Sequence, residues 1–212
     1  MSELFEKISE ILIAGNIEEI KKVTQEALDW EVQAQEILQK GLLPGMDIVG
    51  QRFKACEMFI PEVIRSGNTM HAAMDIIRPL LSENDVADIG TVVIGTVQGD
   101  LHDIGKNLVA MMLEGAGFKV VNLGTDVNPQ AFVEAVKEHK AHILGMSALL
   151  TTTMPKMKET VTALQELGIR NHVKVMAGGA PVTQDFVDEI GADAYGSNAA
   201  AAVEKAKAFV EK

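Results

Sequence analysis

Apolar residues recur at every third or fourth position through residues 2–81, which is the spacing of amphipathic helices. This pattern predicts a series of five helices. Gly15-Asn16 separates the first two, Gly41 ends the third, and Leu43-Pro44-Gly45 precedes the fourth. The fifth begins near Pro61, because proline is favoured in the first turn of a helix. Short connections between amphipathic helices indicate a compact antiparallel bundle.

The pattern changes after a polar stretch at residues 81–88, whose composition is typical of a linker. Short hydrophobic runs then alternate with amphipathic segments. We expect strands at 91–97, 118–123, 142–147, 173–177 and 193–195, and helices at 103–115, 129–139, 154–167, 183–190 and 198–210. Five strand–helix units in succession imply right-handed crossovers and a doubly wound parallel sheet.

The chain is therefore expected to combine two domains of different class, α followed by α/β. Residues 1–84 would form a helical bundle, and residues 85–212 a five-stranded flavodoxin-like, or Rossmann-like, domain. The linker would then supply a hinge at Ser82–Asp88.

Composition narrows the possible partners. The 212 residues are 47% hydrophobic, enough for a sizeable core, and carry a net charge of −11 that is spread over the whole chain. Nucleic acid is disfavoured because phosphate binding needs a basic patch. No apolar run reaches the roughly 18 residues of a membrane span, and the N-terminus does not read as a secretion signal. The lone Cys56, which we interpret as a small structural hydrophobe, fits a reducing cytoplasm. We therefore expect a cytoplasmic protein with no membrane partner.

The most unusual segment is Gly99-Asp100-Leu101-His102-Asp103-Ile104-Gly105, between a hydrophobic run and a helical pattern. It is thus predicted to be a loop at the carboxyl edge of the sheet, where open parallel sheets bind ligands. The spacing of Asp100 and His102 lets the carboxylate reach back to the imidazole. A carboxylate on one ring nitrogen fixes the tautomer and makes the other nitrogen a better metal donor.

Two further loops at the same predicted edge are unusual, Ser147–Thr153 with its hydroxyls and Ala177–Ala180 with its paired glycines. Each has an ordinary interpretation. Thr153 suits an N-cap in front of Met154-Pro155, and a Gly-Gly pair after a strand is commonly a turn. A lone loop histidine is more often solvated or capping than a metal ligand, so no single loop establishes a function.

The three loops in combination resemble the cobalamin-binding domain of methionine synthase and its relatives. The shared features are Asp-x-His-x-x-Gly, then Ser-x-Leu, then Gly-Gly, with His102, Ser147 and Gly178 separated by 45 and 31 residues. The segments 49–53 and 58–61 are similar to the helical cap of that family. Because no catalytic domain is attached, the chain is most similar to the small corrinoid proteins of methyltransferase systems, which shuttle methyl groups from methanol, methylamines or betaines.

The resemblance implies a role for each matching residue. His102 would be the lower axial ligand of cobalt, with Asp100 on its other ring nitrogen. Thr153 stands where the family's proton relay ends in a serine, so Asp100 and Thr153 would share a proton during catalysis. The remaining cofactor-binding residues implied are Gly99, Leu101, Asp103, Ile104, Gly105, Ser147, Leu149, Thr151, Gly178, Gly179 and Ala180, with Met58 and Phe59 covering the upper face.

A methyl carrier is the first hypothesis that follows. Cobalamin, in its methylcobalamin form during turnover, would be loaded by a substrate-specific methyltransferase and unloaded by a methylcobamide-accepting methyltransferase, with a reductive activator as a third partner. The alternatives are a cobalamin sensor or store without methyl transfer, a subunit of an adenosylcobalamin mutase, and a flavodoxin-like nucleotide binder without cobalt. The helical region 2–81 counts against a mutase, and the lack of Gly-x-Gly-x-x-Gly counts against a dinucleotide site.

Overall fold

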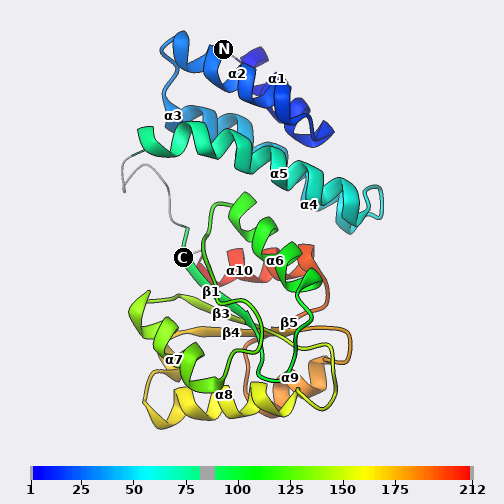
Figure 1. Cartoon of the computed structure of the whole chain (residues 1–212), viewed down its shortest axis with the longest axis vertical. Coiled ribbons are helices and arrows are strands. Elements are labelled where there is room, and N and C mark those ends of the chain that lie inside the picture. The colour runs from blue at the N-terminus through cyan, green and yellow to red at the C-terminus, as the bar shows by residue number, and fades with distance from the viewer. Residues whose placement is uncertain (1, 82–88, 211–212) are drawn as a thin grey trace. The chain divides into compact units, whose positions relative to one another are not determined.

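The computed structural model describes residues 2–81 and 89–210, and these residues form two compact units (Figure 1). The first unit holds the helices of 2–81, and the second holds almost all of 89–210. Apart from Leu81, the predicted linker and its hinge at Ser82–Asp88 lie outside the described residues.

The first unit is helical throughout. Its elements are α1 (Ser2–Ala14), α2 (Ile17–Asp29), α3 (Ala34–Glu36), the π-helix η1 (Ile37–Leu42), α4 (Leu43–Lys54), α5 (Ile60–Ile77) and the short 3-10 helix η2 (Arg78–Leu80). Helix α1 packs against α2 and α4, and α5 packs against the same two helices. Ile8, Leu12 and Ile20 are fully buried between them. The helical character predicted for this region is confirmed.

The predicted break around Gly41 and Leu43-Pro44-Gly45 is wrong, because the chain stays helical from α3 through η1 into α4. The amide of Leu43 bonds to the carbonyl of Leu38, five residues back. Pro44 has no amide hydrogen, and its ring would crowd the carbonyl four residues earlier in a regular α-helix. The wider π turn accommodates this proline without ending the helix.

Gly41 and Gly45 serve packing rather than helix termination. A Cβ at Gly41 would lie 2.9 Å from Cγ2 of Ile8, and a Cβ at Gly45 would lie 3.2 Å from Cα of Ser9. The hydroxyl of Ser9 also donates to the carbonyl of Gly41 at 2.6 Å. The two glycines therefore let α1 approach this helical segment closely.

Cys56 is exposed, so its interpretation as a small structural hydrophobe is wrong. It follows α4 with a positive φ of 60°. The amide of Cys56 bonds to the carbonyl of Phe53, and the amide of Glu57 bonds to that of Arg52. These are the two bonds of a Schellman motif, whose left-handed residue projects away from the helix that it ends.

The second unit is built on a parallel sheet with the strand order β2-β1-β3-β4-β5. The strands are β1 (Thr91–Thr96), β2 (Lys119–Asn122), β3 (Ile143–Ser147), β4 (Lys174–Gly178) and β5 (Ala194–Gly196). Every residue of β1 is buried. Thr96 pairs with Ser147, and Ser147 pairs with Gly178, so β1, β3 and β4 end level with one another. The predicted five-stranded parallel sheet is confirmed.

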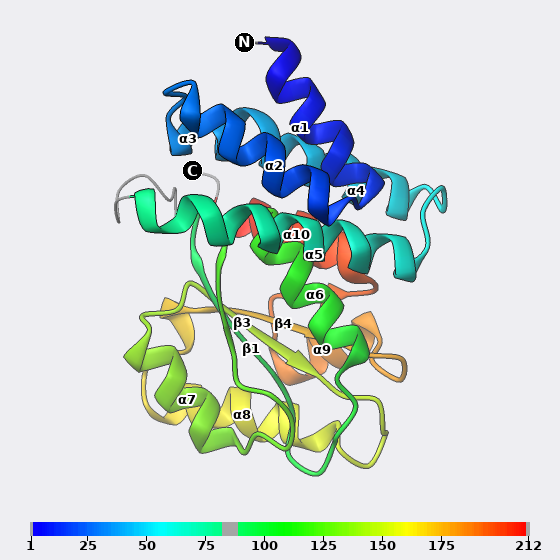
Figure 2. The same ribbon diagram turned by 45° about the horizontal axis from the view of Figure 1, so that its top comes forward.

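Helices cover both faces of this sheet. They are α6 (Ile104–Gly115), α7 (Pro129–Glu138), α8 (Pro155–Glu166), α9 (Gln184–Ile190) and α10 (Ala199–Val210), with the 3-10 turn η3 at Arg170–His172. Helices α6 and α10 lie on one face, and α7, α8 and α9 on the other (Figures 1 and 2). Phe132, Met157 and Leu164 belong to the core between the sheet and the second group. No helix among the described residues is both long and apolar enough to cross a membrane.

Replacing Gly95 tests how tightly the central strand packs. A Cβ at this position in β1 would lie 2.7 Å from Cε1 of Phe132, a fully buried residue of α7. Gly95→Ala should therefore lower the free energy of unfolding by about 1–3 kcal/mol, because overpacking displaces the ring or the strand. Urea denaturation followed by circular dichroism measures this. Gly105→Ala is the matched control, since a Cβ there meets no atom within 4 Å; equal stability of the two variants would contradict the packing.

Candidate functional site

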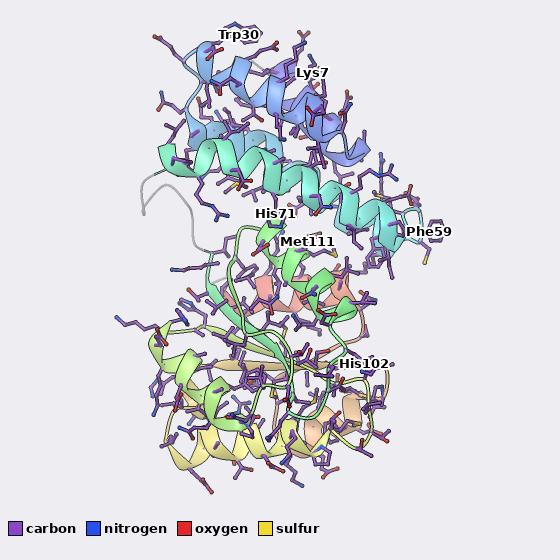
Figure 3. All side chains as sticks on the ribbon, viewed as in Figure 1. Lys7, Trp30, Phe59, His71, His102 and Met111 are labelled. Atoms are coloured by element: carbon purple, nitrogen blue, oxygen red, sulfur yellow. The ribbon has the colours of Figure 1, made fainter. Side chains whose placement is uncertain are left out.

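The loop that follows β1 places His102 at the carboxyl edge of the sheet, where β1 leads into α6 (Figure 3). The chain turns at Gly99, which has a positive φ of 84°. The amide of Asp100 then donates to the carbonyl of Val97 at 3.1 Å. The hydroxyl of Thr96 donates to the carbonyl of His102 at 2.9 Å. These bonds hold the loop against the strand that precedes it.

Asp100 lies at the centre of the site with 0% of its surface exposed. Its Oδ1 accepts the amide of His102 at 3.0 Å and faces Nδ1 of the same ring at 2.8 Å. Its Oδ2 accepts the amides of Leu149 and Leu150 at 2.7 and 3.1 Å and the hydroxyl of Thr153 at 2.9 Å. One carboxylate thus joins the loop after β1 to the loop after β3.

The ionisation of Asp100 follows from these contacts. Burial by itself raises the pKa of the Asp100 carboxyl, but the hydrogen bonds that it accepts lower the pKa by more. The largest lowering contributions come from the amides of His102 and Leu149. The net pKa lies well below the usual range for aspartate, so the group is a carboxylate at neutral pH.

The orientation of the His102 ring follows from that charge. A carboxylate acts only as an acceptor, so Nδ1 carries a proton, and in the neutral form of the ring the lone pair is therefore on Nε2. The His102 side chain is 53% exposed. No group of three or more His, Cys, Asp or Glu among residues 2–81 and 89–210 is placed to hold a metal ion. A single imidazole suits a metal whose other ligands come largely from a macrocycle.

The surface around the ring is apolar and open. Leu101 is 72% exposed and Ile104 is 75% exposed, and Leu149 and Leu150 on the neighbouring loop are exposed too. Exposed large apolar side chains gathered in one place mark a binding site. A Cβ at Gly105 would meet no atom within 4 Å, which leaves room for a ligand beside the start of α6. Asp103, by contrast, accepts a hydrogen bond from Asn107 within α6.

The loops after β3 and β4 meet at the same edge. The carbonyl of Ser147 accepts the amide of Val97 at 3.0 Å, and that of Gly178 accepts the amide of Ala148 at 3.2 Å. Gly179 has a φ of 124°, and a Cβ there would lie 1.9 Å from the carbonyl oxygen of Ala148. Only glycine fits this close approach. The adjoining Thr151 and Ala180 are exposed.

Met58 and Phe59 are not among the residues that the sheet brings together, because they belong to the helical unit. Met58 is buried there. Phe59 is 68% exposed at the N-cap of α5 (Figure 3).

The structure overturns one ordinary interpretation of Thr153. The N-cap of α8 is Met154, and no side chain caps that helix. The Thr153 hydroxyl lies instead 2.9 Å from Oδ2 of Asp100 and 2.8 Å from the carbonyl oxygen of Leu150. As an N-cap, the Thr153 oxygen would accept a hydrogen bond from an amide of α8. Here the hydroxyl instead donates to a buried carboxylate, and a hydrogen bond to an ionised acceptor is stronger than one between neutral groups.

Sequence reasoning gave no individual role to Thr96 or Leu150 and did not predict the burial of Lys106. Thr96 could have been found, because it is a polar residue at the end of a buried hydrophobic strand. Leu150 acts through its backbone amide, which leaves no signal in the sequence. Lys106 is almost fully buried, and its ammonium donates to Oδ1 of Asn122 at 2.7 Å and to Asn107. Burial lowers the pKa of Lys106, and the charge of Asp103 partly opposes this.

Comparison with known proteins gives a consistent result over nearly the whole chain. The family described as B12 binding domain matches residues 90–204, and a second family of the same description matches residues 4–78. Trimethylamine corrinoid protein 1 of Methanosarcina acetivorans is 43% identical over 98% of this chain and 97% of its own length.

Two solved structures are similar in fold and in sequence. A cobalamin-binding protein from Desulfitobacterium hafniense aligns with a TM-score of 0.80 and 36% identity, covering 98% of both chains. A chain of the methanol:cobalamin methyltransferase complex from Methanosarcina barkeri aligns with a TM-score of 0.88 and 33% identity, covering 98% of this chain and 80% of that one.

Asp100→Asn should reveal how much the buried carboxylate stabilises the fold. An amide cannot accept all of these donors, so the free energy of unfolding should fall by about 2–3 kcal/mol near neutral pH. Because the folded-state pKa of Asp100 is lowered, its stabilisation is present above the unfolded-state pKa of about 3.9 and is lost as the pH falls below it. The difference between wild type and variant should therefore narrow below about pH 5.

Urea denaturation across a pH series measures this difference, with Asp185→Asn at the exposed first turn of α9 as the control. A difference between wild type and Asp100→Asn that stays constant down to low pH would mean that Asp100 is not held as a carboxylate.

Proposed function

Because this chain belongs to the family of corrinoid proteins with B12-binding domains, we propose that it carries a methyl group between a substrate-specific methyltransferase and a methylcobamide-accepting methyltransferase. Bound cobalamin supplies the cobalt centre that accepts the methyl group and gives it up again. The observation that supports this role most is the pairing of a half-exposed imidazole with a buried carboxylate on an open, apolar surface. A reductive activator is a third expected partner.

In this proposal His102 would hold the cobalt of bound cobalamin through Nε2, as the lower ligand that the family resemblance implies. Asp100 holds the proton on Nδ1 and fixes the orientation of the ring. A carboxylate behind an imidazole also makes the ligating nitrogen more basic, which strengthens the bond to a metal. The five hydrogen bonds on Asp100 keep it in place whether or not the ring is ligated.

Thr153 supports a proton step in the Asp100–His102 pair. Its hydroxyl hydrogen has two acceptors in reach, Oδ2 of Asp100 and the carbonyl of Leu150. A proton arriving on Oδ2 would be accommodated if the hydroxyl turned toward Leu150 and accepted from the carboxyl group. The pair would then take up a proton when His102 releases the metal and lose it when His102 binds again.

In this proposal the other residues at the carboxyl edge of the sheet would form the rest of the cobalamin-binding site. Leu101 and Ile104 would contact the corrin ring. The space beside Gly99, Asp103 and Gly105 and along the neighbouring loops would hold the displaced nucleotide tail, with Ser147, Leu149, Thr151, Gly178, Gly179 and Ala180 as its lining. Met58 and the exposed Phe59 of the helical unit would shield the upper face of the corrin ring, because water must be kept away from the reduced cobalt.

A methylamine is the donor that we favour. The relative at 43% identity is named as a trimethylamine corrinoid protein, whereas the chain from the methanol system is 33% identical. The donor is chosen by the partner methyltransferase, so this assignment is tested separately from the carrier role.

Methyl exchange tests both assignments. The protein is loaded with cobalamin, reduced, and mixed with a trimethylamine methyltransferase and trimethylamine, and visible absorbance follows methylation of the bound cofactor. Wild type should be methylated. His102→Ala should lose the spectrum of an imidazole-coordinated cobalamin and should react at least about tenfold more slowly, because the tuned ligand is gone.

His172→Ala, an exposed histidine of η3 at the opposite edge of the sheet, is the control and should match wild type. Tight cobalamin binding without methyl exchange with any methyltransferase would identify a store or sensor instead. Exchange with a methanol methyltransferase alone would refute the methylamine assignment but keep the carrier role.

A further inference from the structure

The loop between β2 and α7, residues 123–128, folds over the end of β1. The amide of Thr96 donates to the carbonyl of Gly124 at 3.0 Å, and the amide of Val127 donates to the carbonyl of Thr96 at 3.0 Å. Val97 and Val127 form an isolated parallel bridge. The loop therefore extends the sheet past the end of β2, next to the segment that carries Asp100 and His102.

Asp126 makes the contacts that reach this segment. Its Oδ1 accepts the amide of Gly99 at 2.7 Å, and its own amide donates to the carbonyl of Asp100 at 3.1 Å. Asp126 thus holds the backbone of Gly99 and Asp100 with two hydrogen bonds, one that it accepts and one that it donates. Asp126 adopts a φ of 57°, which is uncommon for a residue other than glycine and is tolerated best by Asn and Asp.

A second set of bonds from the end of β2 holds the other end of the His102 loop. Oδ1 of Asn122 accepts the buried ammonium of Lys106 at 2.7 Å and the amide of Gly124 at 3.0 Å. Nδ2 of Asn122 donates to Asn107 at 3.2 Å. Lys106 and Asn107 form the first turn of α6. The residues before and after His102 are therefore both fixed to the same strand end.

We propose that Asp126 is a positioning residue for the His102 ligand. The hydrogen bonds of Asp126 go to the backbone of Gly99 and Asp100 and not to the side chains of Asp100 and His102, so it acts through the backbone that carries them. The chain turns at Gly99, a residue type that tolerates many backbone conformations. If the Gly99 amide had no acceptor, the Asp100–His102 pair would sample more conformations. A smaller fraction of these conformations would place the imidazole correctly for metal binding. This inference rests on the proposed function in that His102 is taken as the cobalt ligand.

Two variants distinguish the role of Asp126 as the acceptor of the Gly99 amide from the role of its left-handed backbone conformation. Asp126→Gly keeps the left-handed conformation and removes the acceptor, whereas Asp126→Asn keeps both an oxygen acceptor and tolerance of that conformation. Lys140→Gly is the matched control, because Lys140 also has a positive φ, 48°, in the turn that precedes β3.

The first measurement uses the protein without cofactor. Amide hydrogen exchange at Gly99, followed by NMR, should accelerate in Asp126→Gly and remain close to wild type in Asp126→Asn and Lys140→Gly. The second uses aquocobalamin at about pH 7. Asp126→Gly should bind it about fivefold more weakly and with a smaller imidazole-coordinated fraction by visible absorbance, and Asp126→Asn should restore both to within about twofold of wild type.

The outcomes are distinct. If Asp126→Gly only lowers the unfolding midpoint, with Gly99 exchange, affinity and spectrum as in wild type, Asp126 merely stabilises its turn and the inference is overturned. If His102→Ala has the same cobalamin spectrum as wild type, the proposed function fails instead. Gly99 exchange in the protein without cofactor still decides whether Asp126 holds the loop.

Discussion

The hydrogen bonding of one buried carboxylate determines the arrangement of the site. Removing an ionised aspartate from water costs several kcal/mol unless strong donors replace the lost hydration. Asp100 has 0% exposure, and its donors come from its own loop and from residues about fifty positions later in the chain. Separating the loops after β1 and β3 would remove all three donors from Oδ2 of the buried carboxylate. The packing of the two loops at the sheet edge and the orientation of the His102 ring therefore depend on the same carboxylate.

This constraint explains the contrast between the two sides of the loop. Beneath the ring every oxygen of Asp100 is satisfied, and the hydroxyl of Thr96 holds the carbonyl of His102. Above it, Leu101 and Ile104 expose most of their surface, and space remains beside Gly105. The hydrogen bonds of Asp100 fix the orientation of His102 before the cofactor binds, and the exposed apolar side chains provide a surface for it. Binding of a large planar cofactor therefore needs little reorganisation of the protein.

Much of this arrangement could be predicted from the sequence, because it depends on periodicity and spacing. Alternating hydrophobic runs and amphipathic segments indicated the parallel sheet, and the two-residue spacing of Asp100 and His102 indicated their contact. Backbone donors could not be predicted, since every residue other than proline has an amide and nothing marks Leu149 or Leu150. Thr153 was ambiguous because a hydroxyl in front of a helix has the same signature whether it caps the helix or meets a carboxylate.

The helical unit shows a related limit. Gly41 and the proline that follows it carry the usual signals of a helix end, yet the chain continues through a π turn. The glycine is required by the close approach of α1, a contact between segments that are distant in sequence. Local signals predict such positions poorly when the requirement is tertiary.

The most direct test of the account is whether a histidine nitrogen of this protein binds cobalt. Protein labelled with nitrogen-15 only at histidine is loaded with cobalamin and reduced to the paramagnetic cobalt(II) state, and its electron paramagnetic resonance spectrum is recorded. Nitrogen-15 has nuclear spin one half, so the account predicts that the superhyperfine triplet of unlabelled protein becomes a doublet, and that the doublet is absent from His102→Ala. A triplet that survives labelling would show that the axial nitrogen belongs to the cofactor, and would contradict the role given to His102.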